Sequence, residues 1–444
     1  MRTQLVRPLR PTHHILLAAL ASACGGGGGT APEPPPPPEP VQCLAIADEI
    51  TFFRGPASNE WNDVLVDPQQ RVWLAGYADG QLGQNIEPSG NSRAVLRQLA
   101  RDGSLLWESG AEFDTPGTDV AEALALDAQG RVLAAGRTTG SFPGHVNAGQ
   151  FDTFVAWNGG AGWRVHQNGT ERPQRPRQLS VAPDGDILVA GYDDVYIPTN
   201  FVEAWADPFV QRLAWLDTGQ PGERLQARWT HQLGSSADDQ ADAQALDPVA
   251  RGSASYVAGA VNTGAERGMF LRKLGADGGV LWNVRPAANL FGHIAAVIAQ
   301  ADGALLVGGS AFGSVHGALP IGAQDVFVAR IDASDGRVLQ AWQFGTVDSE
   351  RLADMKLDAD GNILLLGETL GAVVPGQPKA GEVDLFMMKL SPTGQLLAAR
   401  QWGTADDEGA RRLAVDACGR VLAVGYSAAN GRRAGVMWFW RPAV

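Results

Sequence analysis

Residues 123–136 read ALALDAQGRVLAAG: an apolar strand, a tight turn at Asp127 to Gly130, and a second apolar strand that ends in Gly136. A single hairpin of this kind cannot bury its own apolar faces, so its copies are expected to stack on one another. The repeat predicts a fold but no ligand. It occurs seven times, and the other copies end at Gly76, Gly191, Gly259, Gly309, Gly367 and Gly425.

Each copy continues into a third strand and a fourth strand. The third carries a pair such as Phe154-Val155, and the fourth carries a tryptophan in six copies. Side chains alternate between the two faces of a strand, and four of the tryptophans lie an even number of residues after the preceding turn glycine. We therefore expect these rings to point to one side and to pack between neighbouring sheets. The six are Trp107, Trp163, Trp229, Trp282, Trp342 and Trp402.

The length of the repeat identifies the architecture. The six intervals between Gly76 and Gly425 average about 58 residues, and four-stranded repeats of this length are typical of β-propellers. The predicted fold class is all-β, a seven-bladed β-propeller of four-stranded antiparallel blades. Its repeats start near residues 56, 112, 170, 235, 289, 346 and 404.

Three motifs carry a family resemblance over about 390 residues. The hairpin, an Asp-x-Phe-Val strand and an Asp-Gly-x-x-x-Trp strand together resemble the bacterial β-propeller repeat (SBBP-like) found in secreted proteins. The resemblance implies the fold but no activity, because propellers host many unrelated functions. The fourth strand also resembles quinone-binding propeller enzymes, but it occurs as well in non-enzymatic assembly lipoproteins.

The two ends of the predicted propeller, residues 43–444, are expected to meet. The seventh copy stops after its third strand at residues 438–442, and residues 49–55 look like an isolated fourth strand. Pairing the two would close the ring and remove an exposed edge. Cys418 lies in the turn between the first two strands of the last copy, and Cys43 precedes the isolated strand. Both lie at one end of the blade, so a disulfide between them is predicted, with two unpaired thiols as the alternative.

The N-terminal residues are read as a targeting segment. Residues 1–23 combine Arg2, Arg7 and Arg10 with a short apolar run at 15–20. The stretch 21–24, Ala-Ser-Ala-Cys, resembles a bacterial lipoprotein signal, which implies that Cys24 is lipidated; ordinary secretion would cleave the same bond. Residues 24–42 form a Gly/Pro-rich tether. The expected location is the cell envelope, lipid-anchored at the outer membrane and facing either the periplasm or the exterior.

The charge of the chain limits its partners. The 444 residues carry a formal net charge of −13. Removing three leader arginines brings the mature chain to −16. Such a surface disfavours nucleic acid and anionic lipid, so we expect no nucleic-acid partner, a membrane contact only through the lipid anchor, and a monomer.

No catalytic motif stands out in the sequence. The seven histidines show no metal-ligand spacing, and Ser310 lacks the second glycine of a nucleophile elbow. We therefore expect no catalytic activity and no cofactor. A bound Ca²⁺ is the one possibility that the sequence leaves open.

Two groups of loop residues are candidate ligand sites. In the third repeat, an aromatic loop between the second and third strands suggests a grip on a peptide or a sugar, with simple packing over the blade edge as the alternative; its candidates are Tyr192, Tyr196, Phe201, Trp205 and Asp207. The acidic loops between repeats suggest a cation site, with capping of loop amides as the alternative; their candidates are Asp238, Asp239, Asp348, Asp406 and Asp407.

The predicted function is a lipid-anchored, extracytoplasmic, non-catalytic binding or scaffolding module. It would take a protein or glycan ligand on the loop face, the end of the ring that bears the loops between repeats and between second and third strands. One alternative is a glycan-active or other enzyme using the channel, which carboxylates with shifted pKa values around the channel would favour. Another is a purely structural surface protein.

Overall fold

Seven separate β-sheets account for nearly all of the regular structure. The predicted signal peptide and Cys24 lie outside the described residues. The computed structural model describes residues 42–47, 49–53, 57–82, 88–89, 91–159, 162–193, 206–216, 224–234, 239–246, 254–261, 268–286, 291–429 and 432–442.

Each sheet has four antiparallel strands in up-and-down order, and we number the sheets as blades 1 to 7 along the chain. Blade 1 comprises β2 (Ser58–Val66), β3 (Val72–Leu82), β5 (Arg93–Leu99) and β6 (Leu105–Glu108), with the short β4 (Pro88–Ser89) paired to β3. Blade 2 comprises β7 (Asp119–Leu126), β8 (Val132–Thr138), β9 (Asp152–Asn158) and β10 (Trp163–Asn168). Blade 3 comprises β11 (Gln174–Val181), β12 (Ile187–Asp193), β13 (Asp207–Leu216) and β14 (Arg224–Gln232).

Blades 4 to 7 repeat the same order. Blade 4 comprises β15 (Asp239–Leu246), β16 (Ser255–Val261), β17 (Gly268–Leu274) and β18 (Val280–Val284). Blade 5 comprises β19 (Gly292–Ala299), β20 (Ala304–Ala311), β21 (Asp325–Asp332) and β22 (Val338–Phe344). Blade 6 comprises β23 (Glu350–Leu357), β24 (Ile363–Thr369), β25 (Asp384–Leu390) and β26 (Leu396–Trp402). Blade 7 comprises β27 (Asp407–Val415), β28 (Val421–Ala429), β29 (Arg432–Trp440) and β1 (Ile50–Phe53).

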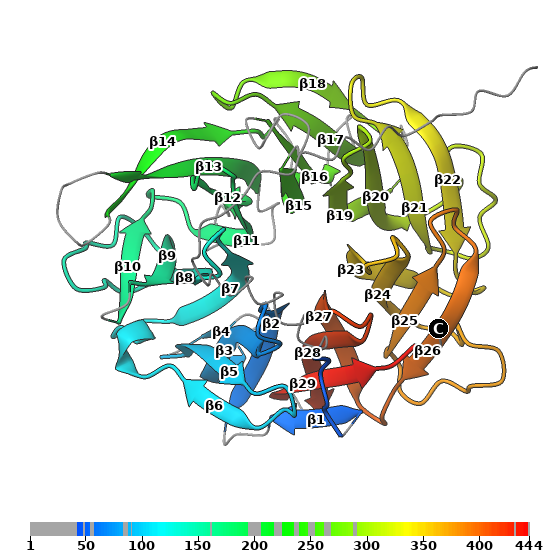
Figure 1. The fold of residues 1–444 in the computed structure, drawn as a ribbon, viewed down its shortest axis with the longest axis horizontal. Coiled ribbons are helices and arrows are strands. Elements are labelled where there is room, and N and C mark those ends of the chain that lie inside the picture. Colours follow the sequence, from blue (N-terminus) through cyan, green and yellow to red (C-terminus); the bar gives the residue numbers. More distant parts are fainter. Residues whose placement is uncertain are drawn as a thin grey trace, which may run out of the picture. The chain divides into compact units, whose positions relative to one another are not determined.

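The blades are arranged around a common centre. Figure 1 shows the first strand of every blade innermost and the fourth strand outermost. First strands of successive blades contact one another around the whole ring, including β27 with β2. The predicted seven-bladed propeller is therefore confirmed.

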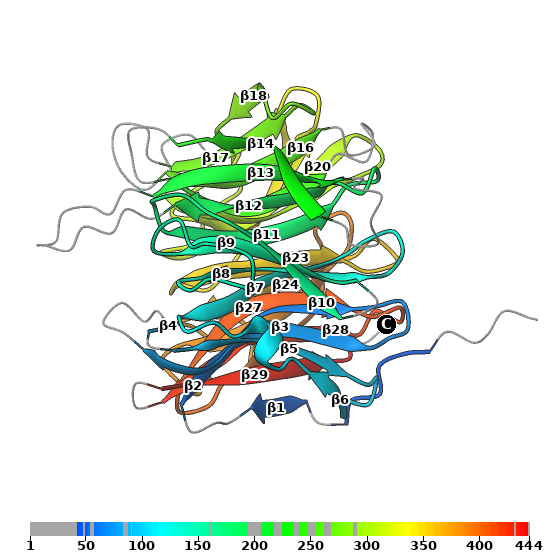
Figure 2. The ribbon, with the colours of Figure 1, turned by 90° about the vertical axis from the view of Figure 1, so that its left-hand side faces the viewer.

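The ring is closed by the N-terminal strand, as predicted. β1 pairs antiparallel to β29, with Ile50 opposite Trp438, and Figure 2 shows the two strands side by side in blue and red. The predicted disulfide is also present: Cys43 is bonded to Cys418, with their Cα atoms 5.7 Å apart. It ties the segment before β1 to the turn between β27 and β28. Such a cross-link stabilises the fold mainly by restricting the unfolded chain.

A recurrent β-bulge explains the glycine that ends each hairpin. Every first strand bulges at the same place, and the residue before the bulge pairs with that glycine, as Trp61 does with Gly76 and Ala410 with Gly425. A methyl group on Gly76 would lie 1.9 Å from the carbonyl oxygen of Glu60. Only glycine fits there, because the bulged backbone approaches the second strand too closely for a side chain.

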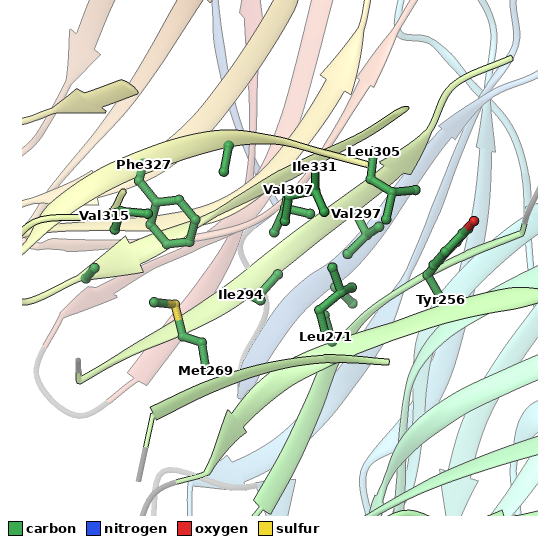
Figure 3. Close-up of a cluster of buried hydrophobic side chains, with 14 of the residues drawn as sticks. Tyr256, Met269, Leu271, Ile294, Val297, Leu305, Val307, Val315, Phe327 and Ile331 are labelled. Carbon is green, nitrogen blue, oxygen red and sulfur yellow. The ribbon is translucent and has the colours of Figure 1, made fainter. Parts of the chain in front are cut away.

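The hydrophobic core lies between neighbouring blades. Figure 3 shows one such layer, in which Met269 and Leu271 of blade 4 pack with Ile294, Val307 and Phe327 of blade 5. All five side chains are fully buried. Burying an aliphatic or aromatic side chain of this size contributes about 1.5–3 kcal/mol, so the stability of each blade depends on its neighbours.

The tryptophans of the fourth strands make the predicted contacts between blades. The indole of Trp229 in blade 3 donates a hydrogen bond to the Ala276 carbonyl of blade 4 (2.8 Å), and that of Trp282 in blade 4 donates to the Ala333 carbonyl of blade 5 (3.3 Å). In blade 5, Trp342 lies against Gly394 of blade 6. Each ring thus covers the turn between the third and fourth strands of the next blade.

Helix is almost absent from the described part of the chain. The one helical segment there is the single 3₁₀ turn η1 (Ala111–Phe113). None of the described residues belongs to a helix with the length and apolar character that crossing a membrane requires.

The close approach of the first-strand and second-strand backbones at the bulge can be tested by substitution. We expect Gly76→Ala to lower the free energy of unfolding by roughly 1–3 kcal/mol, because the backbone of Glu60 must move to admit the methyl group. Gly275→Ala is the matched control, since its methyl would meet nothing closer than a side-chain oxygen of Asp277 at 3.1 Å. Urea denaturation measures both variants. Equal losses would contradict the steric explanation.

Candidate functional site: a basic central channel

The acidic loop residues cap the loops between blades. Asp119, Glu350 and Glu408 begin or nearly begin their strands, and each carboxylate accepts hydrogen bonds from the amide and the hydroxyl of a threonine four residues earlier. The predicted cation ligands lie beside them. The backbone amides of Asp348 and Asp406 donate to the hydroxyls of the same threonines. The carboxylates of Asp119, Glu350 and Glu408 therefore have the capping role that the alternative describes.

Of the other predicted cation ligands, the structure describes the side chain of Asp407. Asp407 accepts a hydrogen bond from the Val383 amide (3.2 Å), Asp238 lies outside the described residues, and of Asp239 the structure describes only the backbone at the start of β15. Among the described residues, the one set of three potential ligands within reach of a single ion is Cys43, Cys418 and Asp416, and its two sulfurs form the disulfide. Calcium binding stays a prediction.

The aromatic loop of the third repeat is described only in part, because Tyr196, Phe201 and Trp205 lie outside the described residues. Tyr192 is buried at the end of β12, and its hydroxyl accepts a hydrogen bond from Arg175 (3.0 Å). Asp207 forms an ion pair with Arg172 (2.6 Å). Tyr192 therefore connects this loop to the arginines of the innermost strand β11.

The first strands bring a set of basic residues to the centre of the ring. Four of these strands, β11, β19, β23 and β27, line a pocket there. The bulge that each of them carries lies at the level of this pocket and redirects the side chains beside it. We call four of the lining residues the channel mouth: Arg177, His293, Arg351 and Arg411.

The arginines around the channel mouth surround buried carboxylates. Glu122 lies 2.9 Å from Arg137, 3.8 Å from Arg175 and 3.9 Å from Arg177. In the neighbouring blade 1, Glu60 pairs with Arg411 (2.5 Å) and with Arg433 (2.6 Å) of blade 7. Burial alone would raise the pKa of Glu60, but the two guanidinium groups outweigh it and hold the pKa below its ordinary value. The carboxylate therefore stays ionised inside the protein.

The two partners of these ion pairs differ in exposure. The side chains of Arg177 and Arg411 are 23% and 22% exposed, whereas those of Glu122 and Glu60 are 4% and 2% exposed. The side chain of Arg351 is 49% exposed and lies 3.8 Å from the less exposed Glu368. The arginine side chains are therefore more exposed to solvent than the carboxylates with which they pair. The channel mouth is basic although the whole chain is acidic.

Arg412 closes the channel below the mouth. It reaches from β27 across the ring to donate a hydrogen bond to the Arg177 carbonyl on β11 (3.1 Å), and a second one to the Ala353 carbonyl on β23 (3.3 Å). The free space left in the pocket is only about 20 Å³, roughly the room of one water molecule. A single small group of a ligand can enter here, but a whole ligand cannot.

Two buried aspartates in the first strands hold neighbouring blades together. Asp63 of blade 1 accepts a hydrogen bond from the Leu124 amide of blade 2 (2.7 Å), and Asp354 of blade 6 accepts one from the Leu413 amide of blade 7 (3.0 Å). Burial raises the pKa of Asp63 to about 6, although Arg412 and the Leu124 amide act to lower it. A carboxylate with a raised pKa is what the enzyme alternative calls for. Both oxygens of Asp63 nevertheless accept backbone amides, which makes it a structural anchor.

Two larger grooves lie on the rim of the ring between blades 1, 2 and 3, with volumes of about 670 and 610 Å³. They share Trp163, whose ring stacks on Trp107 with the two planes 16° apart. Both grooves adjoin segments 160–161 and 217–223, which lie outside the described residues. We therefore base no site on them.

The residues of the channel mouth could be inferred from the sequence only in part. Arg172, Arg175 and Arg177 lie close together in the sequence where the third repeat begins, whereas Arg351, Arg411 and His293 lie far apart from one another. The signal that would have found these three is their spacing from the hairpin glycines. Aligning the repeats on those glycines places all three within one residue of the bulge in their strands.

Comparison with known proteins gives limited information. No family model matches the sequence. A stretch of 98 residues is 34% identical to the regulatory protein FlaEY of Caulobacter vibrioides, which covers 21% of this chain and only 10% of that protein.

Solved structures of low sequence identity resemble the chain along most of its length. Sqt1 of Chaetomium thermophilum bound to the N-terminus of ribosomal protein L10 has a TM-score of 0.45 at 10% identity, covering 88% of this chain and 98% of that one. YCF48 bound to D1 peptide has a TM-score of 0.47 at 12% identity, covering 91% and 99%. Puromycin hydrolase has a TM-score of 0.49 at 14% identity, covering 91% and 58%.

The raised pKa of Asp63 predicts a pH dependence of stability. A carboxyl group whose pKa is higher in the folded state than its ordinary value of 3.8 binds more protons when folded, so its contribution to stability is fully present below pH 4 and is lost as the pH rises through about 6. We expect the stability of the wild type, relative to Asp63→Asn, to fall by about 3 kcal/mol between pH 4 and pH 7. Urea unfolding at both pH values measures the difference, and a pH-independent difference would contradict the assignment.

Proposed function

We propose that this chain is a non-catalytic binding module that holds an anionic group of its ligand at the channel mouth. The observation that carries this proposal is the unequal exposure of the ion pairs, in which each arginine side chain is more exposed than the carboxylate beside it. Guanidinium groups bind carboxylates and phosphates through short, charge-assisted hydrogen bonds. A group held in place by buried carboxylates is also pre-organised, which reduces the entropy lost on binding.

The charge of the rest of the chain limits which kinds of anionic ligand can bind. With a formal net charge of −13, the protein repels long polyanions, so nucleic acid remains excluded as a partner. A ligand with one or a few acidic groups avoids this repulsion, since only those groups approach the channel mouth. The protein or glycan partner expected from the sequence is compatible with this site if it carries one or a few acidic groups.

The anion site is tested with a short acidic probe. We expect an end-blocked triglutamate peptide to bind the full-length protein at low salt, its triglutamine analogue not to bind, and Arg351→Gln to weaken binding about tenfold, since one of the exposed cations is lost. Arg337→Gln is the matched control, because Arg337 is also exposed but lies at the opposite end of blade 5. Isothermal titration calorimetry measures the affinities. Failure of triglutamate to bind the wild type would favour the purely structural alternative.

We further propose that Cys24 is lipidated and anchors the module to the outer membrane after export. The leader, the cysteine and the Gly/Pro-rich tether support this proposal. With Cys24→Ala, we expect the exported protein to move from the membrane fraction to the soluble fraction, because its only membrane contact is lost. Fractionation of cells that express the full chain measures this shift. A Cys24→Ala protein that remains in the membrane fraction would contradict the lipid anchor.

A further inference from the structure

A cluster of exposed apolar side chains lies next to the channel mouth on the loop face of blades 5 and 6. We call it the apolar platform. Single exposed apolar residues are ordinary, but a group of neighbouring ones on a soluble protein marks an interaction surface. Its members are Phe291, Phe312, Leu319, Ile321, Val347 and Leu370.

Backbone hydrogen bonds hold the loops of the platform together. The Phe312 amide donates to the Phe291 carbonyl (2.8 Å), and the two rings meet edge to face at 6.2 Å. The Ala323 amide donates to the Asp348 carbonyl, and the Leu370 amide to the Ser349 carbonyl, both at 3.0 Å. Three loops from two blades are thereby joined. The surface is built before any partner arrives, which favours binding.

The platform is continuous with the channel mouth along the chain. Phe291 lies two residues before His293 of the mouth, or roughly 7 Å along an extended chain. Val347 lies four residues before Arg351 in the loop that leads into β23. A short segment of a partner can therefore reach both surfaces at once.

We infer that the ligand of the channel mouth is a polypeptide segment in which an acidic residue is flanked by apolar side chains. This inference rests on the proposed function. The acidic residue enters the channel mouth, where there is space for one small group, and the apolar side chains lie on the platform. Charge complementarity positions the acidic residue of the segment, and burial of its apolar side chains adds to the binding free energy.

The shape and composition of the platform favour a peptide over other acidic ligands. It is an open surface of aliphatic and phenylalanine side chains rather than an enclosed cavity, so a fatty acid would leave much of its chain in water. A peptide presents side chains one at a time and suits such a surface.

The experiment selects ligands from a library of displayed short random peptides with the full-length protein at low salt. We expect the selected peptides to combine an acidic residue with aliphatic or aromatic neighbours. Phe312→Ser and Ile321→Ser should each weaken the binding of such a peptide about tenfold and leave triglutamate binding unchanged. Leu281→Ser is the matched control, because Leu281 is equally exposed but lies on the outer strand β18.

The outcomes separate the two proposals. Selected peptides that are acidic without apolar residues, or whose binding is indifferent to Phe312→Ser and Ile321→Ser, would overturn the peptide inference and leave the anion site intact. Displacement of a selected peptide by laurate, at an affinity that Ile321→Ser weakens, would replace the peptide with a fatty acid. Selected peptides whose binding depends on the platform but not on Arg351 would overturn the anion site instead.

Discussion

The close approach of the first two strands of every blade is the constraint on which the rest of the structure depends. The first strand bulges opposite a glycine, and no side chain fits between the two backbones. Because the bulge recurs at one level in all seven blades, it surrounds the channel with redirected side chains. In blades 3 and 7 these include Arg177 and Arg411, so the structural device that shapes each blade also forms the channel mouth.

Charged residues at the centre of a fold require a physical explanation, because burying an ion pair costs more in lost hydration than its attraction returns unless the geometry is good. Here each carboxylate forms ion pairs with several arginines: Glu122 with three and Glu60 with two. By this reasoning, a protein with apolar residues at the centre of the ring would be no less stable than this one. Stability therefore does not account for this polar centre, whereas the proposed binding of an anionic group would.

Much of the fold could be predicted from the sequence because it repeats. Seven copies of one hairpin fix the number of blades, and the missing strand of the last copy indicates both the closure by β1 and the disulfide between Cys43 and Cys418. The site could not be predicted in this way, because it is what differs between copies. A lone Arg351 or an Arg411-Arg412 pair in a strand looks like a solvated position until the ring brings these residues to one pocket. The acidic loops are the converse case: the carboxylates of Asp119, Glu350 and Glu408 recur in three blades, and each of them caps a loop amide.

The exterior and the centre of the molecule carry opposite charge, and the consequence is selectivity. An acidic exterior discourages contact with anionic polymers and surfaces, whereas the arginines at the channel mouth attract a single acidic group that comes close. Arg412, which spans the channel beneath them, prevents that group from going deeper. Under the proposed function, the remainder of the ligand would then lie on the loop face. There it would meet the exposed apolar side chains of blades 5 and 6, and electrostatic attraction and apolar burial would both contribute to its affinity.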